Sequence, residues 1–150
     1  MSDPVFRKHD GRFRWQGVET RAYKQESGVP YHDVTRQVLF DDPLLRCQLR
    51  YFEIAPGGYT TLERHEHVHA VVIQRGRGRV LVGDAIATLS PFDLVRIPPM
   101  TWHQFRADDD APLGFLCLVN HERDRPQLPD ADALTALRAD PAIGAFLRAG

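Results

Sequence analysis

The strongest constraint on the fold of this chain is a set of metal-binding side chains at every second position of one short segment. The set comprises one carboxylate and three imidazoles: Glu63, His65, His67 and His69. Alternate side chains of an extended strand share one face. Four polar groups on the inner face of a sheet are costly to bury unless they share a partner, and these residue types bind first-row divalent metals. The segment therefore predicts a metal site inside a β structure, and a further imidazole, His103, lies downstream.

The composition is that of one globular domain. The chain has 150 residues, of which 43% are apolar and 26% charged, so we expect a single domain over residues 1–150. The net charge of −1 gives no reason to expect nucleic acid or a membrane surface as a partner. We find no apolar run that would span a bilayer and no signal peptide. The two cysteines, Cys47 and Cys117, do not make a disulfide framework, so we expect a cytoplasmic protein.

Short strands separated by Pro, Gly, Ser and Asp dominate the middle of the chain. We expect them at residues 34–40, 46–54, 59–65, 69–75, 79–82, 85–89, 94–97, 102–106 and 113–119. A turn is expected at Pro56-Gly57-Gly58, and Gly83-Asp84 is typical of a hairpin. So many short strands at close spacing favour a β-barrel or a β-sandwich.

The two ends of the chain differ from this β core, which spans about residues 34–120. Residues 1–33 are polar, with Trp15 and Tyr23 as the main apolar anchors, and we expect an arm that packs on the barrel or on a second subunit. Residues 128–150 predict short helices, because Asp130 or Asp132 can cap a helix. Pro141 would end that helix and precede a second one.

The metal-binding segment resembles the first motif of the cupins, which reads Gly, five residues, His-x-His, three or four residues, Glu, six residues, Gly. The same frame is filled here by Gly57, Glu63, His65, His69 and Gly76. The carboxylate and one imidazole have exchanged places. The second cupin motif is matched by Pro98 and His103, with Met100 in place of a glycine. The matched region, residues 49–107, covers the core of the cupin fold.

This resemblance implies an all-β protein with the cupin double-stranded β-helix, a jelly-roll barrel. It implies one divalent metal held by four residues: Glu63, His65, His69 and His103. His67 falls in the bend between the second and third ligands. A register in which His65, His67 and His69 bind the metal stays open.

Other side chains are candidates for substrate contacts. Arg50 and Arg96 lie inside otherwise apolar strands, and an arginine that points into a barrel mouth can hold a phosphate or a carboxylate. Cys117 lies in the apolar segment 115–119, where a cysteine is either a small apolar filler or a thiol that lines the pocket.

Three longer stretches narrow the resemblance: residues 50–58, residues 62–69, and residues 112–117 together with 123–129. They are similar to small single-domain bacterial cupins of the cupin-2 type, a group that includes methylthioxylulose-phosphate methylsulfurylases. Those enzymes use manganese and a thiol to release a methylthio group. The resemblance implies a metal-dependent enzyme that acts on a methylthio-keto-sugar phosphate, with Glu63 or His67 as a base and Cys117 as a candidate thiol.

Manganese is the metal that this similarity favours, while iron, nickel and zinc also suit the donor set. The expected partners are a small-molecule substrate and a thiol co-substrate such as glutathione. Exposed edge strands and the arm favour a homodimer. Two other functions stay open: a non-haem iron or manganese dioxygenase, and a non-catalytic module that binds a small ligand.

Overall fold

The computed structural model describes residues 4–23 and 32–148. Its elements are β1 (Arg21–Ala22), β2 (His32–Asp42), β3 (Cys47–Tyr59), β4 (His69–Gly76), β5 (Gly78–Val82), β6 (Ala85–Leu89), β7 (Leu94–Ile97), β8 (His103–Ala107), β9 (Leu113–Asn120), α1 (Ala131–Arg138) and α2 (Pro141–Phe146). Strands dominate, as expected for an all-β protein. Within the described ranges no helix has the length and apolar character needed to cross a membrane.

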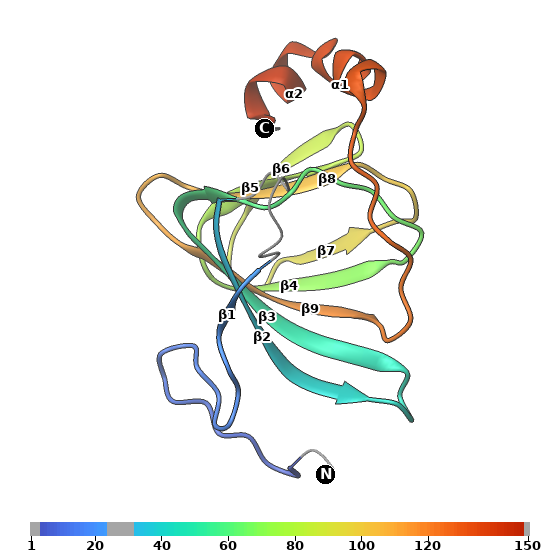
Figure 1. The fold of residues 1–150 in the computed structure, drawn as a ribbon. Coiled ribbons are helices and arrows are strands. Elements are labelled where there is room, and N and C mark those ends of the chain that lie inside the picture. Colours follow the sequence, from blue (N-terminus) through green and yellow to red (C-terminus); the bar gives the residue numbers. More distant parts are fainter. Residues whose placement is uncertain (1–3, 24–31, 149–150) are drawn as a thin grey trace.

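The strands form two antiparallel groups that curl around a common interior (Figure 1). One group has the order β2-β3-β9-β4-β7, and the other has the order β6-β5-β8. The long strand β3 joins them, because Tyr59 at its end pairs with Arg106 of β8. This arrangement confirms the predicted cupin jelly roll.

Apolar side chains from both groups fill the interior. Their buried members include Val34, Phe52, Ile54, Val71, Ile73, Val80, Leu89, Ile97, Phe105, Leu113, Phe115 and Val119. Alternation along the strands sends these side chains inward. Some of their sequence neighbours are also buried on the other face, because Tyr51 lies under the N-terminal arm and Leu81 and Gln104 lie under the C-terminal segment. The core supports a small polar region at one end, where the metal-binding residues lie.

The predicted path of the chain between residues 54 and 65 is wrong. Pro56-Gly57-Gly58 was expected to be a turn but lies within β3. Gly57 adopts a φ of +77°, a conformation that glycine adopts without a steric penalty. The strand bends at this residue but does not end there. The segment expected as a strand over 59–65 is instead irregular after Tyr59, and only Glu63 and Arg64 form isolated bridges.

The C-terminal helices follow their predicted signals. The side chain of Asp130 accepts a hydrogen bond from the backbone N–H of Ala133 at 2.8 Å and so caps α1. Asp140 caps α2, which begins at Pro141. The helices lie over the β5–β6–β8 side of the barrel (Figure 1). There they complete a second apolar cluster, whose buried members are Leu62, Leu81, Ile143, Phe146 and Leu147.

The N-terminal arm packs on the opposite part of the barrel, which is one of the two placements that the sequence suggested; contact with a second subunit stays a prediction. The rings of Phe13 and Trp15 lie 5.5 Å and 5.1 Å from the ring of Tyr51, measured between centroids. The side-chain amide of Gln37 in β2 donates a hydrogen bond to the carbonyl of Phe13 at 2.8 Å. Tyr23 packs edge-on against Phe52, so the arm reaches the interior.

A substitution at Phe146 measures how much the C-terminal helices stabilise the barrel. Its side chain is 1% exposed, so Phe146→Ala should lower the free energy of unfolding by about 3–5 kcal/mol through lost burial and a residual cavity. Phe6→Ala is the matched control, since Phe6 is 76% exposed. Urea unfolding followed by circular dichroism measures both. Equal stability of the two variants would mean that the helices do not contribute to the barrel.

Candidate metal centre

Three imidazoles from different parts of the chain meet at one end of the barrel interior. His65 lies in the irregular segment before β4, His69 begins β4 and His103 begins β8. One ligand atom from each lies within 4.8 Å of the other two. The Nε2 atoms of His65 and His69 are 2.9 Å apart. Nitrogen ligands at about 2.1 Å from one ion are roughly 3 Å apart when they meet at right angles, so this spacing fits a shared metal.

The second nitrogen of each ring has a partner that orients the ring. His65 Nδ1 lies 2.6 Å from the carbonyl oxygen of His67, and His103 Nδ1 lies 2.9 Å from that of Thr101. A carbonyl only accepts, so both Nδ1 atoms must carry the proton, and the lone pair of each neutral ring lies on Nε2. His69 Nδ1 lies 2.8 Å from Cys117 Sγ. Such contacts fix the tautomer and ring orientation of metal-ligating histidines.

Burial keeps His65 and His69 neutral. The pKa of His65 is lowered to about 4, chiefly by burial and then by the neighbouring His103 and His67. The pKa of His69 is lowered further, again chiefly by burial. Metal ligands must be deprotonated. The donor set is therefore compatible with a divalent first-row metal ion at neutral pH.

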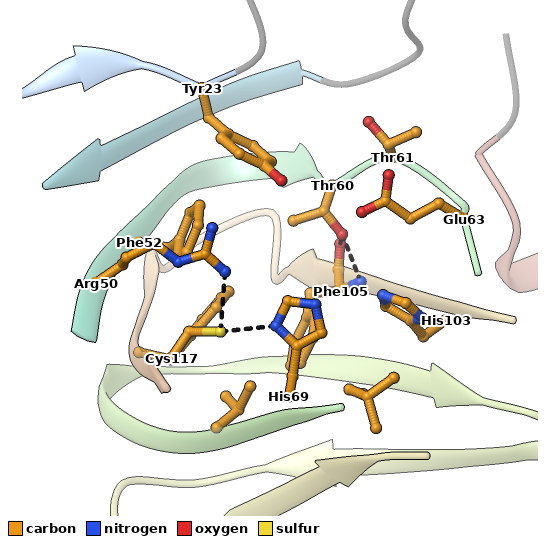
Figure 2. Close-up of a pocket in the computed structure, with 13 residues that line it drawn as sticks. Tyr23, Arg50, Phe52, Thr60, Thr61, Glu63, His69, His103, Phe105 and Cys117 are labelled. Atoms are coloured by element: carbon orange, nitrogen blue, oxygen red, sulfur yellow. Dashed lines mark hydrogen bonds between the residues drawn. The ribbon is translucent and has the colours of Figure 1, made fainter. Parts of the chain in front are cut away.

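Glu63, the predicted fourth ligand, lies next to the histidines. Its backbone forms a bridge with His103, with hydrogen bonds of 3.3 Å and 3.0 Å in the two directions. Its side chain is 7% exposed and lines the same cavity as His69 and His103 (Figure 2). The three mutually close ligand atoms found among the described residues belong to the histidines alone. Ligation by Glu63 stays a prediction.

His67 lies behind His65 rather than on the cavity wall. The two rings stack in parallel, with centroids 3.6 Å apart and an angle of 2° between their planes. Residues 66 and 67 form a bend, and this bend takes His67 out of the strand alternation that the sequence suggested. A catalytic role for His67 stays a prediction.

Asp124 holds this bend in place, and sequence reasoning missed it. One carboxylate oxygen accepts from the backbone N–H of Glu66 at 2.8 Å. The other lies 3.0 Å from the backbone nitrogen of His67 and 2.7 Å from its Nδ1. The pKa of Asp124 is held well below its usual range, first by the Glu66 hydrogen bond and then by those from His67. The carboxylate thus fixes the carbonyl that orients His65.

The cavity beside the histidines is lined by both polar and apolar groups (Figure 2). Its polar lining includes Tyr23, Arg50, Thr60, Thr61 and Cys117. Of the two arginines singled out in the sequence, Arg50 points into the cavity, whereas Arg96 is exposed. Cys117 is 2% exposed, and its Sγ lies between His69 Nδ1 and Arg50 Nη2. Burial raises the pKa of the Cys117 thiol, and Arg50 acts in the opposite direction.

A barrel of this topology with a histidine centre at one end is a cupin. The family model described as "Cupin domain" matches residues 50–119, and the chain belongs to the cupin-2 family. It is 54% identical over 145 residues to the 1-methylthio-D-xylulose 5-phosphate methylsulfurylase of Rhodospirillum rubrum, a match that covers 97% of this chain and 93% of that protein.

Solved structures of similar chains carry the same fold. A cupin 2 conserved barrel domain protein from Rhodopseudomonas palustris is 57% identical, with a TM-score of 0.91, over 95% of this chain and 99% of that chain. A cupin-2 domain protein from Rhodospirillum rubrum is 55% identical, with a TM-score of 0.85, over 94% and 95%. A cupin 2 domain-containing protein from Halorhodospira halophila is 45% identical, with a TM-score of 0.73, over 96% and 94%.

The ligand assignment predicts which histidines retain the metal. His65→Ala and His103→Ala each remove a nitrogen donor and should each abolish most of the bound metal. His67→Ala should leave the metal content near that of the natural protein. His121→Ala is the control, because His121 is half exposed and pairs with Asp41. Elemental analysis after purification measures the stoichiometry; full metal content in the His65 and His103 variants would refute the assignment.

Asp124 should support the metal without touching it. Asp124→Ala removes all three hydrogen bonds to residues 66 and 67, so the metal affinity should fall by about 10- to 100-fold, as is usual when a partner of a ligand is lost. Asp41→Ala removes an aspartate that pairs with a histidine elsewhere and should not change the affinity. Competition with a chelator measures both variants. An unchanged affinity for Asp124→Ala would contradict the supporting role.

Proposed function

We propose that the protein is a metal-dependent enzyme that transfers the methylthio group of 1-methylthio-D-xylulose 5-phosphate to a thiol. The observation that carries this proposal is the similarity to the methylsulfurylase of Rhodospirillum rubrum, because 54% identity extends over 97% of the chain. The histidine centre and the cavity beside it are compatible with the proposed chemistry. A keto-sugar phosphate offers a carbonyl and neighbouring hydroxyl oxygens of the kind that hard divalent ions bind.

The residues of the centre have distinct proposed roles. His65, His69 and His103 would hold the ion through their imidazoles, and Glu63 would complete the set as the carboxylate ligand. Manganese is the proposed metal, and it would act as a Lewis acid on the substrate carbonyl. Three neutral imidazoles and one carboxylate leave a net charge of +1 on a divalent ion. This positive charge would stabilise the negative charge that develops on the carbonyl oxygen when the carbon–sulfur bond breaks.

Cys117 is the proposed acceptor of the methylthio group. Its sulfur attacks the sulfur of the substrate, a new S–S bond forms, and the C1–S bond breaks. The electron pair of that bond moves to C1 and the adjacent carbonyl as an enolate. C1 then takes the proton that the thiol gave up. Carbon C1 is reduced, the two sulfur atoms are oxidised to a disulfide, and the product carries a methyl group at C1.

A second thiol, glutathione in our proposal, restores Cys117. Its sulfur attacks the methylthio sulfur of the mixed disulfide, and Cys117 leaves as the thiol or thiolate. The products of one cycle are the deoxy-sugar phosphate and the mixed disulfide of methanethiol with glutathione. The net reaction needs no oxygen, which separates it from dioxygenase chemistry.

Anaerobic turnover tests the proposal. Manganese-loaded protein, the methylthio-sugar phosphate and glutathione should yield the methylthio–glutathione disulfide in the absence of air, as detected by mass spectrometry. A Cys117→Ser variant should keep its metal and lose this activity, because the hydroxyl is a poor nucleophile toward sulfur. A Cys47→Ser variant is the matched control, since Cys47 is absent from the cavity lining.

Other outcomes lead to different conclusions. Retained activity in Cys117→Ser would mean that the external thiol attacks the substrate directly. Strict dependence on oxygen would support the dioxygenase function, and tight binding of the substrate without turnover would support a binding module.

A further inference from the structure

Arg50 is a buried cation that forms no ion pair with any carboxylate in the described part of the chain. Its residue is 4% exposed and lines the cavity. Nη2 donates to Cys117 Sγ at 3.4 Å, and the guanidinium lies over the ring of Phe52 at 4.9 Å. Its Nε is buried and has no hydrogen-bond partner. Across residues 4–23 and 32–148, no carboxylate forms an ion pair with Arg50.

Such a group is costly unless something supplies the missing partners. An ionised side chain loses its hydration on burial, and neither a sulfur contact nor a ring face replaces a full set of acceptors. A planar guanidinium presents donors in a fork that matches a phosphate or a carboxylate. The orphaned Nε of Arg50 therefore points to an anionic ligand in the cavity.

Two further arginines belong to the chain on either side of β3: Arg36 lies in β2, and Arg123 follows the end of β9. In the register of β2 and β3, Arg36 pairs with Phe52 and Val38 pairs with Arg50, so Arg36 and Arg50 are diagonal neighbours on the inner face. The Arg36 guanidinium lies 5.7 Å from the ring centroid of Tyr23, another residue of the cavity lining. Arg123 follows β9 and donates to the carbonyl of Asn120 at 2.9 Å.

The charges of these arginines act on one another. The pKa of Arg36 is lowered first by burial and then by the positive charge of Arg50. The pKa of Arg123 is lowered by burial, then by Arg50 and Arg36. Mutual repulsion of this kind is relieved when an anion binds among the cations.

We infer that Arg50, together with Arg36 and Arg123, forms an anion subsite that binds the phosphate of the substrate. The subsite lies on the β2–β3–β9 side of the cavity, and Cys117 separates it from the histidine centre (Figure 2). The identity of the anion as a sugar phosphate rests on the proposed function. A carboxylate of glutathione has the same chemistry and is the competing source.

Binding of inorganic phosphate to the metal-loaded full chain tests the subsite directly. Calorimetry should show that Arg50→Gln weakens phosphate binding by about 10- to 150-fold, the effect of losing hydrogen bonds from a charged donor. Arg36→Gln and Arg123→Gln should each weaken it by a smaller factor. Arg96→Gln is the matched control, an exposed strand arginine whose loss should change nothing. Equal affinity in Arg50→Gln and Arg96→Gln, or no phosphate binding by the natural protein, would overturn the inference.

Two further measurements keep this test decisive. If Arg50→Gln fails to fold, the double variant Arg36→Gln/Arg123→Gln decides, because both residues are less buried than Arg50. In steady-state assays, loss of Arg50 should raise the KM for the sugar phosphate and leave the KM for glutathione unchanged. A raised KM for glutathione alone would assign the subsite to the co-substrate and overturn the phosphate inference.

Failure of the subsite is distinguishable from failure of the proposed function. Phosphate binding that depends on Arg50, with no turnover of the methylthio-sugar phosphate, would retain the anion subsite and reject the reaction. Turnover with an unchanged KM in Arg50→Gln would retain the reaction and reject the subsite.

Discussion

The structure depends on the burial of three imidazoles, each of which has a ligand atom within 4.8 Å of the other two. His65 is 1% exposed and His103 is 5% exposed, so neither ring is well hydrated. Polar groups in such positions destabilise a β-barrel unless each finds a partner. The Nδ1 atoms have partners in the protein. A divalent ion would satisfy the Nε2 atoms together, and the proposed metal would in this way offset the cost of burying the cluster.

Two side chains next to the histidines orient the cluster and connect it to the cavity: Asp124 and Cys117. Asp124 fixes the bend at residues 66 and 67, whose carbonyl orients His65. On the other side, Cys117 contacts both His69 and Arg50. The thiol therefore lies between the candidate metal centre and a cationic side chain. The proposed reaction uses this order: carbonyl activation at the histidines, sulfur chemistry at Cys117 and phosphate binding at Arg50.

Local sequence signals predicted the strands, the hairpin and the capped helices, because alternation, Gly-Asp and Asp130 act over a few residues. The path around Gly57 was not predictable, since a glycine at positive φ serves equally in a turn or in a bent strand. The sequence also could not show which of Arg50 and Arg96 points inward, because both lie in otherwise apolar strands. Arg96 shares the outer face of β7 with Leu94, which is 70% exposed, so an apolar neighbourhood did not mean burial. Asp124 lies far from residues 66 and 67 in the sequence, and no local pattern marks that contact.

X-ray absorption spectroscopy of the manganese-loaded protein tests the central claim most directly, because it reports the atoms bound to the metal. The proposed site predicts first-shell nitrogen and oxygen scatterers only, with the outer-shell signature of three imidazoles and one carboxylate. The spectrum should not change in Cys117→Ser, since the sulfur contacts His69 from its Nδ1 side. A sulfur scatterer in the first shell, or fewer than three imidazoles, would contradict the proposed centre.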